Sequence, residues 1–319
     1  MKTNDFFTFY KKYGLFVIIV LLALFFTFAA QGFMTLSNVL NIFKQASIYG
    51  ILCVGVTIVM VSGGTDMSVG GQAALSGLVM AWAMKAGVPP FIAVIAGILT
   101  CMLIGLFNGF FIAFFNTAPI VITLCAKLML DGLTVVLTKG IPIYDFPKSF
   151  YVVGQGFIGD VFPVSIIVLT VAVIIGYLLL QRSYFGRKLF AIGGNREAAR
   201  LAGINIFKTR VYSYLICSGF VGVASWVLLS KTGSASPTAG ASYPFDAMTA
   251  CMLGGVTFGG GNGNVFTTFL GVLIISMLGN GLLLMGYDNN VQQIIKGLIL
   301  LLAMWMDAYQ KIRTSKASS

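Results

Sequence analysis

Long apolar segments, separated by short polar or glycine-rich connections, follow one another along most of the 319-residue chain. Windows of about 20 apolar residues are typical of helices that cross a membrane. The pattern predicts an all-α polytopic membrane protein that forms a single transmembrane domain over residues 1–319. About ten spans, some of them short or broken helices, are expected near 14–33, 47–62, 72–86, 90–115, 119–138, 164–181, 210–230, 245–258, 265–285 and 291–309.

The basic residues predict the orientation of these spans. Lys and Arg gather in the N-terminal tail, in the loop at about 182–210 and in the C-terminal tail. Cytoplasmic loops carry such an excess, so we place all three segments in the cytoplasm. Six spans and then four separate them, which is the even number that this orientation needs, and 139–163 then faces outside. The first apolar segment could be a signal peptide, but its length and the lack of a clear A-x-A site favour a retained span.

Composition narrows the chemistry. Hydrophobic residues make up 58% of the chain and charged residues only 9%, against about 25% charged residues in soluble domains. Histidine is absent and the five cysteines lie in apolar segments without C-x-x-C spacing, which argues against catalytic triads, metal sites and a disulfide framework. The net charge of +11 is concentrated beside the spans, so it indicates orientation and not nucleic-acid binding. We therefore expect no catalytic residue and no bound metal.

Two glycine-rich breaks interrupt the apolar pattern, a first break at 62–71 (SGGTDMSVGG) and a second break at 253–263 (LGGVTFGGGNG). Non-helical backbone at membrane depth must be buried in protein or line a water-filled path, because lipid cannot satisfy its polar groups. Both breaks are therefore candidates for a translocation pathway. The alternative is that they are tight turns at the membrane surface, with Gly255 and Gly259 in a small-residue contact between helices.

The second break does not bind a nucleotide in the manner of a P-loop. Gly254 and Gly259 have the G-x-x-x-x-G spacing, but Gly260 and Gly261 follow where a P-loop needs Lys and Ser or Thr. If transport is driven by ATP, the ATPase must therefore be another subunit. We expect no cofactor on this chain, and ATP and Mg²⁺ on that partner.

A short helix is predicted inside the basic loop. Asn195 is a good N-cap, Glu197 suits the first helical turn, and Gly203 is a natural stop. Glu197 is the only glutamate in the chain. Helical spacing puts Ala198, Leu201 and Ala202 on one face, and Arg196 and Arg200 on another. Such a helix is suited to a groove on a cytosolic partner; the alternative is a helix that rests on lipid headgroups.

Polar side chains inside the spans are the remaining candidates. Asp66 is interpreted as a cap for a helix that begins near Ser68, in preference to a direct contact with solute. Gln72, Asn108 and Asn280 suit hydrogen bonds to a hydroxylated solute or to a neighbouring helix. The candidate pathway residues are therefore Ser62, Gly63, Gly64, Asp66, Ser68, Gln72, Asn108, Gly254, Gly255 and Asn280.

The other intramembrane carboxylates receive structural interpretations. Lys127 and Asp131 are four residues apart and can neutralise each other on one helix, and Asp246 is interpreted as a cap at the membrane boundary. The rival hypothesis is an ion-coupled secondary transporter that uses Asp66, Asp131 and Asp246 as ion sites.

Several short motifs, in order along nearly the whole chain, resemble the ribose-type permease subunits of bacterial ABC sugar importers. They are SGGTDMSVG at 62–70, Gly186-Arg187, AIGGN at 191–195, AARLAGI at 198–204, PTAG at 237–240, Asp246 and Leu253-Gly254-Gly255. Each is weak alone, but the combination is specific.

This resemblance implies an architecture similar to vitamin-B12-type importer permeases, with ten spans per subunit. It implies a homodimer or a heterodimer with a related permease, in the bacterial cytoplasmic (inner) membrane with both termini in the cytoplasm. An extracytoplasmic sugar-binding protein would deliver a sugar or sugar-like solute. A cytoplasmic ABC ATPase would receive a coupling helix, to which we assign Asn195, Arg196, Glu197, Ala198, Arg200, Leu201 and Gly203.

Overall fold

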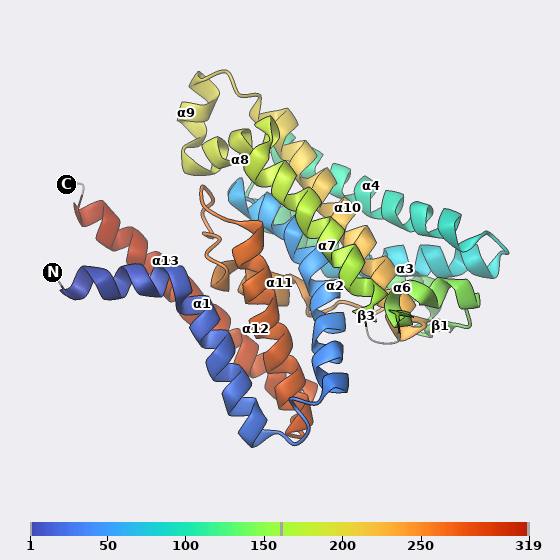
Figure 1. The fold of residues 1–319 in the computed structure, drawn as a ribbon. Coiled ribbons are helices and arrows are strands. Elements are labelled where there is room, and N and C mark those ends of the chain that lie inside the picture. Colours follow the sequence, from blue (N-terminus) through green and yellow to red (C-terminus); the bar gives the residue numbers. More distant parts are fainter. Residues whose placement is uncertain (1, 160–161, 318–319) are drawn as a thin grey trace.

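The computed structural model describes residues 2–159 and 162–317, and side chains within 13–159 and 162–308. The basic side chains of the two tails, on which part of the predicted orientation rests, lie outside these ranges. The molecule is an assembly of helices (Figure 1). Its main helices are α1 (Lys2–Ala29), α2 (Leu36–Val61), α3 (Val69–Lys85), α4 (Pro90–Phe115), α5 (Pro119–Thr138), α7 (Val164–Tyr177), α10 (Ile206–Thr232), α11 (Tyr243–Leu253), α12 (Val265–Leu284) and α13 (Asn289–Ala317).

Each predicted span falls on one of these helices. Within the described residues, seven helical segments are long and apolar enough to cross a membrane, while α3, α11 and the apolar part of α1 are shorter. The structure thus agrees with an all-α polytopic membrane protein. The α4 and α5 helices begin and end at the predicted residues, because each starts with a proline and ends at a residue with positive φ, Asn116 or Lys139.

The α2 helix differs from its predicted span, because it begins at Leu36 where the pattern predicts a start near residue 47. Polar residues in its first turns lower the mean hydropathy there, so a search for apolar windows misses this part of the helix. Three of them have partners on other segments: Asn38 bonds to Asn280 of α12, Lys44 lies over the ring of Phe157, and Gln45 accepts a hydrogen bond from Lys231 of α10. Tertiary contacts therefore extend the helix beyond its apolar part.

The α2 helix runs through the middle of the molecule (Figure 1). It packs against α10, α7, α11 and α12, and nearly all of its residues from Ala46 to Val61 are buried in the largest apolar core. On one side of it lie α3, α4, α5 and α10, which pack against one another; on the other lie α1, α11, α12 and α13. Because α2 belongs to both groups, its C-terminal end and the first break that follows sit between them.

Short elements occupy the end of the molecule opposite the basic loop (Figure 1). Strand β1 (Ile143–Tyr144) pairs antiparallel with β4 (Ser234–Ala235), and β2 (Phe157–Ile158) pairs with β3 (Phe162–Pro163). A 3₁₀ turn η1 (Lys148–Tyr151) and a helical turn α6 (Val152–Gln155) lie between β1 and β2. This is the segment for which the sequence predicts an external position.

Glycines bring α4 and α10 into close contact. The two helices run antiparallel, and Gly105, Gly109 and Gly222 face backbone or Cβ atoms of the other helix. A Cβ on Gly105 would overlap Ser218 Oγ and would lie 2.6 Å from the carbonyl oxygen of Tyr214. Small residues allow such an approach between membrane helices. The start of α10 is consequently held beside the end of α4.

This contact predicts the effect of one methyl group. Gly105→Ala should lower the stability of the detergent-solubilised protein by about 1–3 kcal/mol, because the added carbon overpacks a filled interface. The measurement is the midpoint of thermal unfolding. Gly132→Ala on α5 is the matched control, since a Cβ there meets nothing within 4 Å. Equal midpoints for the two variants would contradict the close packing.

Candidate functional site

The basic loop contains two helices where the sequence predicts one. The unpredicted helix is α8 (Tyr184–Gly194), which follows a π-helical turn η2 (Leu178–Arg182) at the end of α7. Ser183 caps α8 by accepting a hydrogen bond from the backbone N–H of Gly186. Gly186 itself lies against the backbone of Leu180, where a side chain would not fit. The sequence did not predict α8, because the two glycines at its end, Gly193 and Gly194, are typical of a loop before Asn195.

The predicted short helix is α9 (Arg196–Leu201). Its N-cap is confirmed, since Asn195 Oδ1 accepts a hydrogen bond of 3.0 Å from the backbone N–H of Ala198. Its stop is also confirmed: Gly203 has φ of +80° directly after the helix. Glu197 lies in the first turn, 3.8 Å from Arg200 in an exposed ion pair, an arrangement that contributes little to stability.

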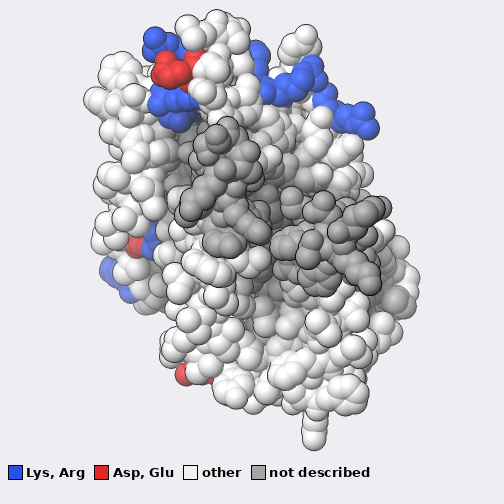
Figure 2. Space-filling view, turned by 90° about the vertical axis from the view of Figure 1, so that its left-hand side faces the viewer, with Lys and Arg blue, Asp and Glu red and all other residues white. Residues whose placement is uncertain are grey.

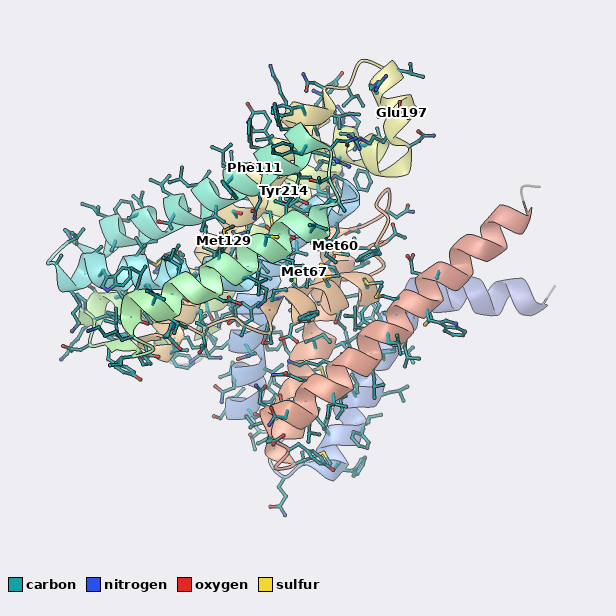
Figure 3. The ribbon with its side chains drawn as sticks, turned by 180° about the vertical axis from the view of Figure 1, so that it is seen from behind. Met60, Met67, Phe111, Met129, Glu197 and Tyr214 are labelled. Carbon is teal, nitrogen blue, oxygen red and sulfur yellow. The ribbon has the colours of Figure 1, made fainter. Side chains whose placement is uncertain are left out.

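The apolar face of α9 points away from the protein. Ala198 and Ala202 are exposed, and the side chain of Leu201 is 85% exposed, whereas Ala199 on the opposite face is buried. Figure 3 shows Glu197 at the extremity of the molecule, well outside the position of Tyr214 in the helical bundle. Lys and Arg side chains gather at the same end (Figure 2). An exposed leucine between basic groups on a projecting helix is suited to contact another molecule.

Five glycines join this loop to both breaks, and we call Gly63, Gly193, Gly194, Gly260 and Gly261 the glycine junction. The amide of Gly261 in the second break donates a 2.9 Å hydrogen bond to the carbonyl oxygen of Val61, at the end of α2. A Cβ on Gly193 would overlap both groups, and a Cβ on Gly260 would lie 2.9 Å from the Cα of Gly193. Three segments that are distant in sequence therefore touch through their backbones at this junction.

The first break is buried and polar. Asp66 is 2% exposed and its Oδ1 accepts hydrogen bonds from the backbone N–H and the hydroxyl of Ser68, just ahead of α3. The predicted bond to a local backbone N–H is present, but the N-cap residue of α3 is Ser68 and not Asp66. Gln72 donates to Asp66 Oδ2 and to Ser68 Oγ, and Asn108 of α4 also donates to Ser68 Oγ. The structure thus brings together four of the predicted pathway residues.

Tyr214 belongs to the same region, although no pattern in the sequence indicated it. Its hydroxyl donates to the carbonyl oxygen of Thr65, and it lies against Gly64, where a Cβ would be 2.7 Å from the phenolic oxygen. The side-chain oxygens of Gln72 and Asn108 are buried and accept no hydrogen bond within the described residues. Buried acceptors of this kind are ones that a water molecule or a hydroxyl group could satisfy.

The remaining pathway candidates lie elsewhere. Asn280 exchanges hydrogen bonds with Asn38 of α2, so its amide serves a helix–helix contact. Gly254 packs against the backbone of Thr268 at the start of α12, and Gly255 is exposed with φ of +82°. The residues from Gly255 to Gly259 are not helical, so the alternative interpretation of a helix–helix contact through Gly255 and Gly259 is wrong.

Asp246 does not act as the predicted cap at the membrane boundary. It is 2% exposed in the first turn of α11, and its Oδ1 lies 3.0 Å from Nζ of Lys296 on α13. Tyr49 of α2 and Ser242 donate hydrogen bonds to Oδ2. Lys296 lies fifty residues away in an apolar span, and spacing along one helix could not reveal this partner. The buried ion pair ties α11 to α13.

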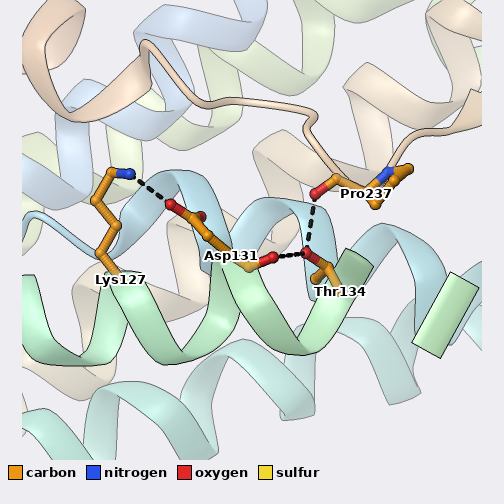
Figure 4. Close-up of polar contacts among 4 residues, drawn as sticks. All are labelled: Lys127, Asp131, Thr134 and Pro237. Carbon is orange, nitrogen blue, oxygen red and sulfur yellow. Dashed lines mark hydrogen bonds and ion pairs between the residues drawn. The ribbon is translucent and has the colours of Figure 1, made fainter. Parts of the chain in front are cut away.

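The predicted pair on α5 is confirmed, since Nζ of Lys127 bonds to Oδ2 of Asp131 (Figure 4). One turn further on, Thr134 Oγ1 donates 2.9 Å to the carbonyl oxygen of Pro237, which links α5 to the connection before α11. Asp66, Asp131 and Asp246 therefore each have partners within the chain. This arrangement does not favour their use as exchangeable ion sites.

Comparison with known proteins identifies the family. Residues 38–304 match the family described as "Branched-chain amino acid transport system / permease component". The chain belongs to this family. It is a transport permease and not an enzyme. The ribose import permease protein of Bacillus subtilis (strain 168) is 36% identical over 296 residues, which cover 92% of this chain and 90% of that protein.

Other relatives carry related names. The ribose import permease protein of Escherichia coli (strain K12) is 34% identical over 300 residues, with 93% of each chain covered. The xylose transport system permease protein of Haemophilus influenzae (strain ATCC 51907 / DSM 11121 / KW20 / Rd) is 29% identical over 366 residues, covering 94% of this chain and 97% of that protein. No solved structure matches the permease.

The Asp246–Lys296 pair predicts non-additive effects on stability. Lys296→Met should destabilise the permease by about 3–5 kcal/mol, because it leaves a buried carboxylate without its cation. The double variant Asp246→Asn/Lys296→Met should recover most of that loss. Thermal unfolding in detergent measures both.

The exposed pair Lys85–Asp145, with N and O atoms 3.2 Å apart, is the control. Lys85→Met should cost less than about 1 kcal/mol. A double variant that is less stable than Lys296→Met, with additive losses, would contradict the pairing.

Proposed function

We propose that this permease is the membrane-spanning subunit of an ATP-driven ABC importer for a sugar or sugar-like solute. The names of the ribose and xylose permeases support the solute class. The polar cluster at the first break suits it as well, because Gln72 and Asn108 offer buried acceptors and the carboxylate there is held by the protein itself. A neutral hydroxylated solute needs hydrogen-bonding groups and no counter-charge.

The observation that carries the proposal is the connection from α9 to both breaks. A partner that binds Leu201 and Glu197 holds α9. Only Asn195 separates the end of α8 from the start of α9. The end of α8 lies in the glycine junction. Force applied to α9 therefore reaches the first and second breaks through backbone contacts, which have few rotatable bonds to absorb the motion.

The partners follow from this assignment. A cytoplasmic ABC ATPase, with its ATP and Mg²⁺, binds the coupling helix at Asn195 to Gly203. An extracytoplasmic sugar-binding protein docks at the opposite end, near the β1–β4 and β2–β3 pairs, and releases solute toward the breaks. A second permease subunit completes the pathway, and rigid-body tilting of the two alternates access.

The proposed architecture and location go together. Ten crossings, with α3, α11 and α1 as the short or partial ones, give a fold similar to vitamin-B12-type importer permeases. The location is the bacterial cytoplasmic (inner) membrane, with α9 and both termini in the cytoplasm. In Figure 1 the start of α1 and the end of α13 lie near each other, at the ends of these helices remote from the turns at 30–35 and 285–288, which agrees with this orientation.

The test is loss of coupling without loss of folding. Leu201→Asp or Glu197→Lys should abolish solute-stimulated ATP hydrolysis in the reconstituted complex of permease, ATPase and binding protein. Leu201 is exposed in the permease, so its replacement leaves the thermal unfolding midpoint of the isolated subunit unchanged. The rate of ATP hydrolysis with and without solute is the measurement.

Lys188→Glu provides the control, because it reverses an exposed charge on α8 outside the α9 face. It should retain at least about half of the coupling, since an isolated rim charge contributes little to binding. Coupling at the level of the unsubstituted protein in both α9 variants would contradict the proposed function.

A further inference from the structure

A cavity of about 230 Å³ lies beside α9 and is separate from the glycine junction. The end of α4 forms one wall, α9 a second, and the first turns of α10 the third. The residues that line it are Ala113, Asn116, Arg196, Glu197, Arg200, Ile206, Phe207 and Arg210. The antiparallel contact of α4 with α10 creates this arrangement, because it places Arg210 next to the last turn of α4.

Three arginines give the cavity a positive charge that the protein does not neutralise. Glu197 is the single acid in its lining, and it lies 3.8 Å from Arg200. In the part of the chain with described side chains, Arg196 and Arg210 form no ion pair and donate no hydrogen bond. Arg210 is nevertheless partly buried. Guanidinium groups that outnumber the acids of a cavity are suited to a phosphate, which they bind with paired hydrogen bonds.

An apolar surface continues from the cavity along α4. Phe207 lines the cavity, and its ring centre is 6.0 Å from that of Phe110. Phe110, Phe114 and Phe115 are all exposed, and the Phe110 and Phe114 rings stack with centres 5.4 Å apart. Figure 3 shows α4 along the outside of the bundle, with Phe111 toward the end that carries α9. The outer face of a spanning helix contacts acyl chains.

We propose that this cavity binds the phosphate of an anionic phospholipid, with Arg196, Arg200 and Arg210 on the headgroup and the acyl chains along the Phe110 and Phe114 face of α4. The continuity of charged cavity and lipid-facing aromatic surface favours a lipid over a free anion. Basic pockets between helices on the cytoplasmic side bind such headgroups. Because Arg196 and Arg200 belong to α9, the bound lipid holds α9 against the ends of α4 and α10.

Titration of the purified permease tests the site without any partner. The protein is held in a neutral detergent and lipid binding is followed by native mass spectrometry, with phosphatidylglycerol as the probe and phosphatidylcholine as the uncharged comparison. Phosphatidylglycerol should bind the more tightly. Arg210→Gln should weaken its binding about tenfold, as expected for one charge-assisted hydrogen bond.

Lys188→Gln is the matched control, because it removes one exposed positive charge of the same loop outside the cavity. It should change the affinity less than about twofold. Thermal unfolding shows whether Arg210→Gln is folded. If it is not, Arg196→Gln on α9 carries the same test and the same expected loss.

Four outcomes would overturn the proposal. Equal affinity for the two lipids, or equal losses in Lys188→Gln and Arg210→Gln, would mean that the site does not select the headgroup. Glycerol phosphate or inorganic phosphate that binds as tightly as phosphatidylglycerol would identify a free anion in place of a lipid. Arginine variants with unchanged lipid affinity but weaker association with the ATPase would assign these side chains to the protein partner.

Discussion

Backbone contact at the glycine junction is the constraint on which the rest of the structure depends. The end of α2, the end of α8 and the second break approach so closely that side chains have no room between them. Such contacts need glycine for two reasons: Gly63, Gly260 and Gly261 have positive φ, and Gly193 faces a carbonyl oxygen directly. Helices α8 and α9 are therefore joined through this junction to the interior of the bundle.

The buried carboxylates of the interior each have partners within the protein. Asp66 is satisfied by Ser68 and Gln72, and Asp246 by Lys296, Tyr49 and Ser242. Buried carboxylates without partners are costly. The side-chain oxygens of Gln72 and Asn108 near the first break, in contrast, are buried acceptors without a donor among the described residues. Gly63 of the glycine junction is followed directly by Gly64 of this region. The polar cluster and the glycine junction are therefore adjacent.

The sequence predicted features that depend on local chemistry. The windows of apolar residues predicted both ends of α4 and α5, and Asn195 and Gly203 predicted the cap and the stop of α9. The i, i+4 spacing identified the Lys127–Asp131 pair. Motif order along the chain identified the family, because that order does not depend on knowing which residues touch.

What the sequence did not predict depends on contacts between distant segments. The first turns of α2 are polar and are helical because Asn38 and Gln45 find partners on α12 and α10. Lys296 was not predicted as the partner of Asp246, because the two residues are distant in sequence. The contact among the three segments of the glycine junction could not be predicted, because glycine has no side chain whose polarity or size would indicate a partner. The α8 helix was missed because its final glycines, which the close approach requires, resemble a loop.

The central claim is that α8 and α9 move with the two breaks as one unit. Distances between spin labels at Lys188 and Asn262, both exposed, measure it most directly in the reconstituted complex with and without ATP. The account predicts an unchanged Lys188–Asn262 distance and a changed distance from Asn262 to an exposed label at Thr232, at the other end of α10. A Lys188–Asn262 distance that changes on ATP binding, while the Asn262–Thr232 distance stays constant, would contradict it.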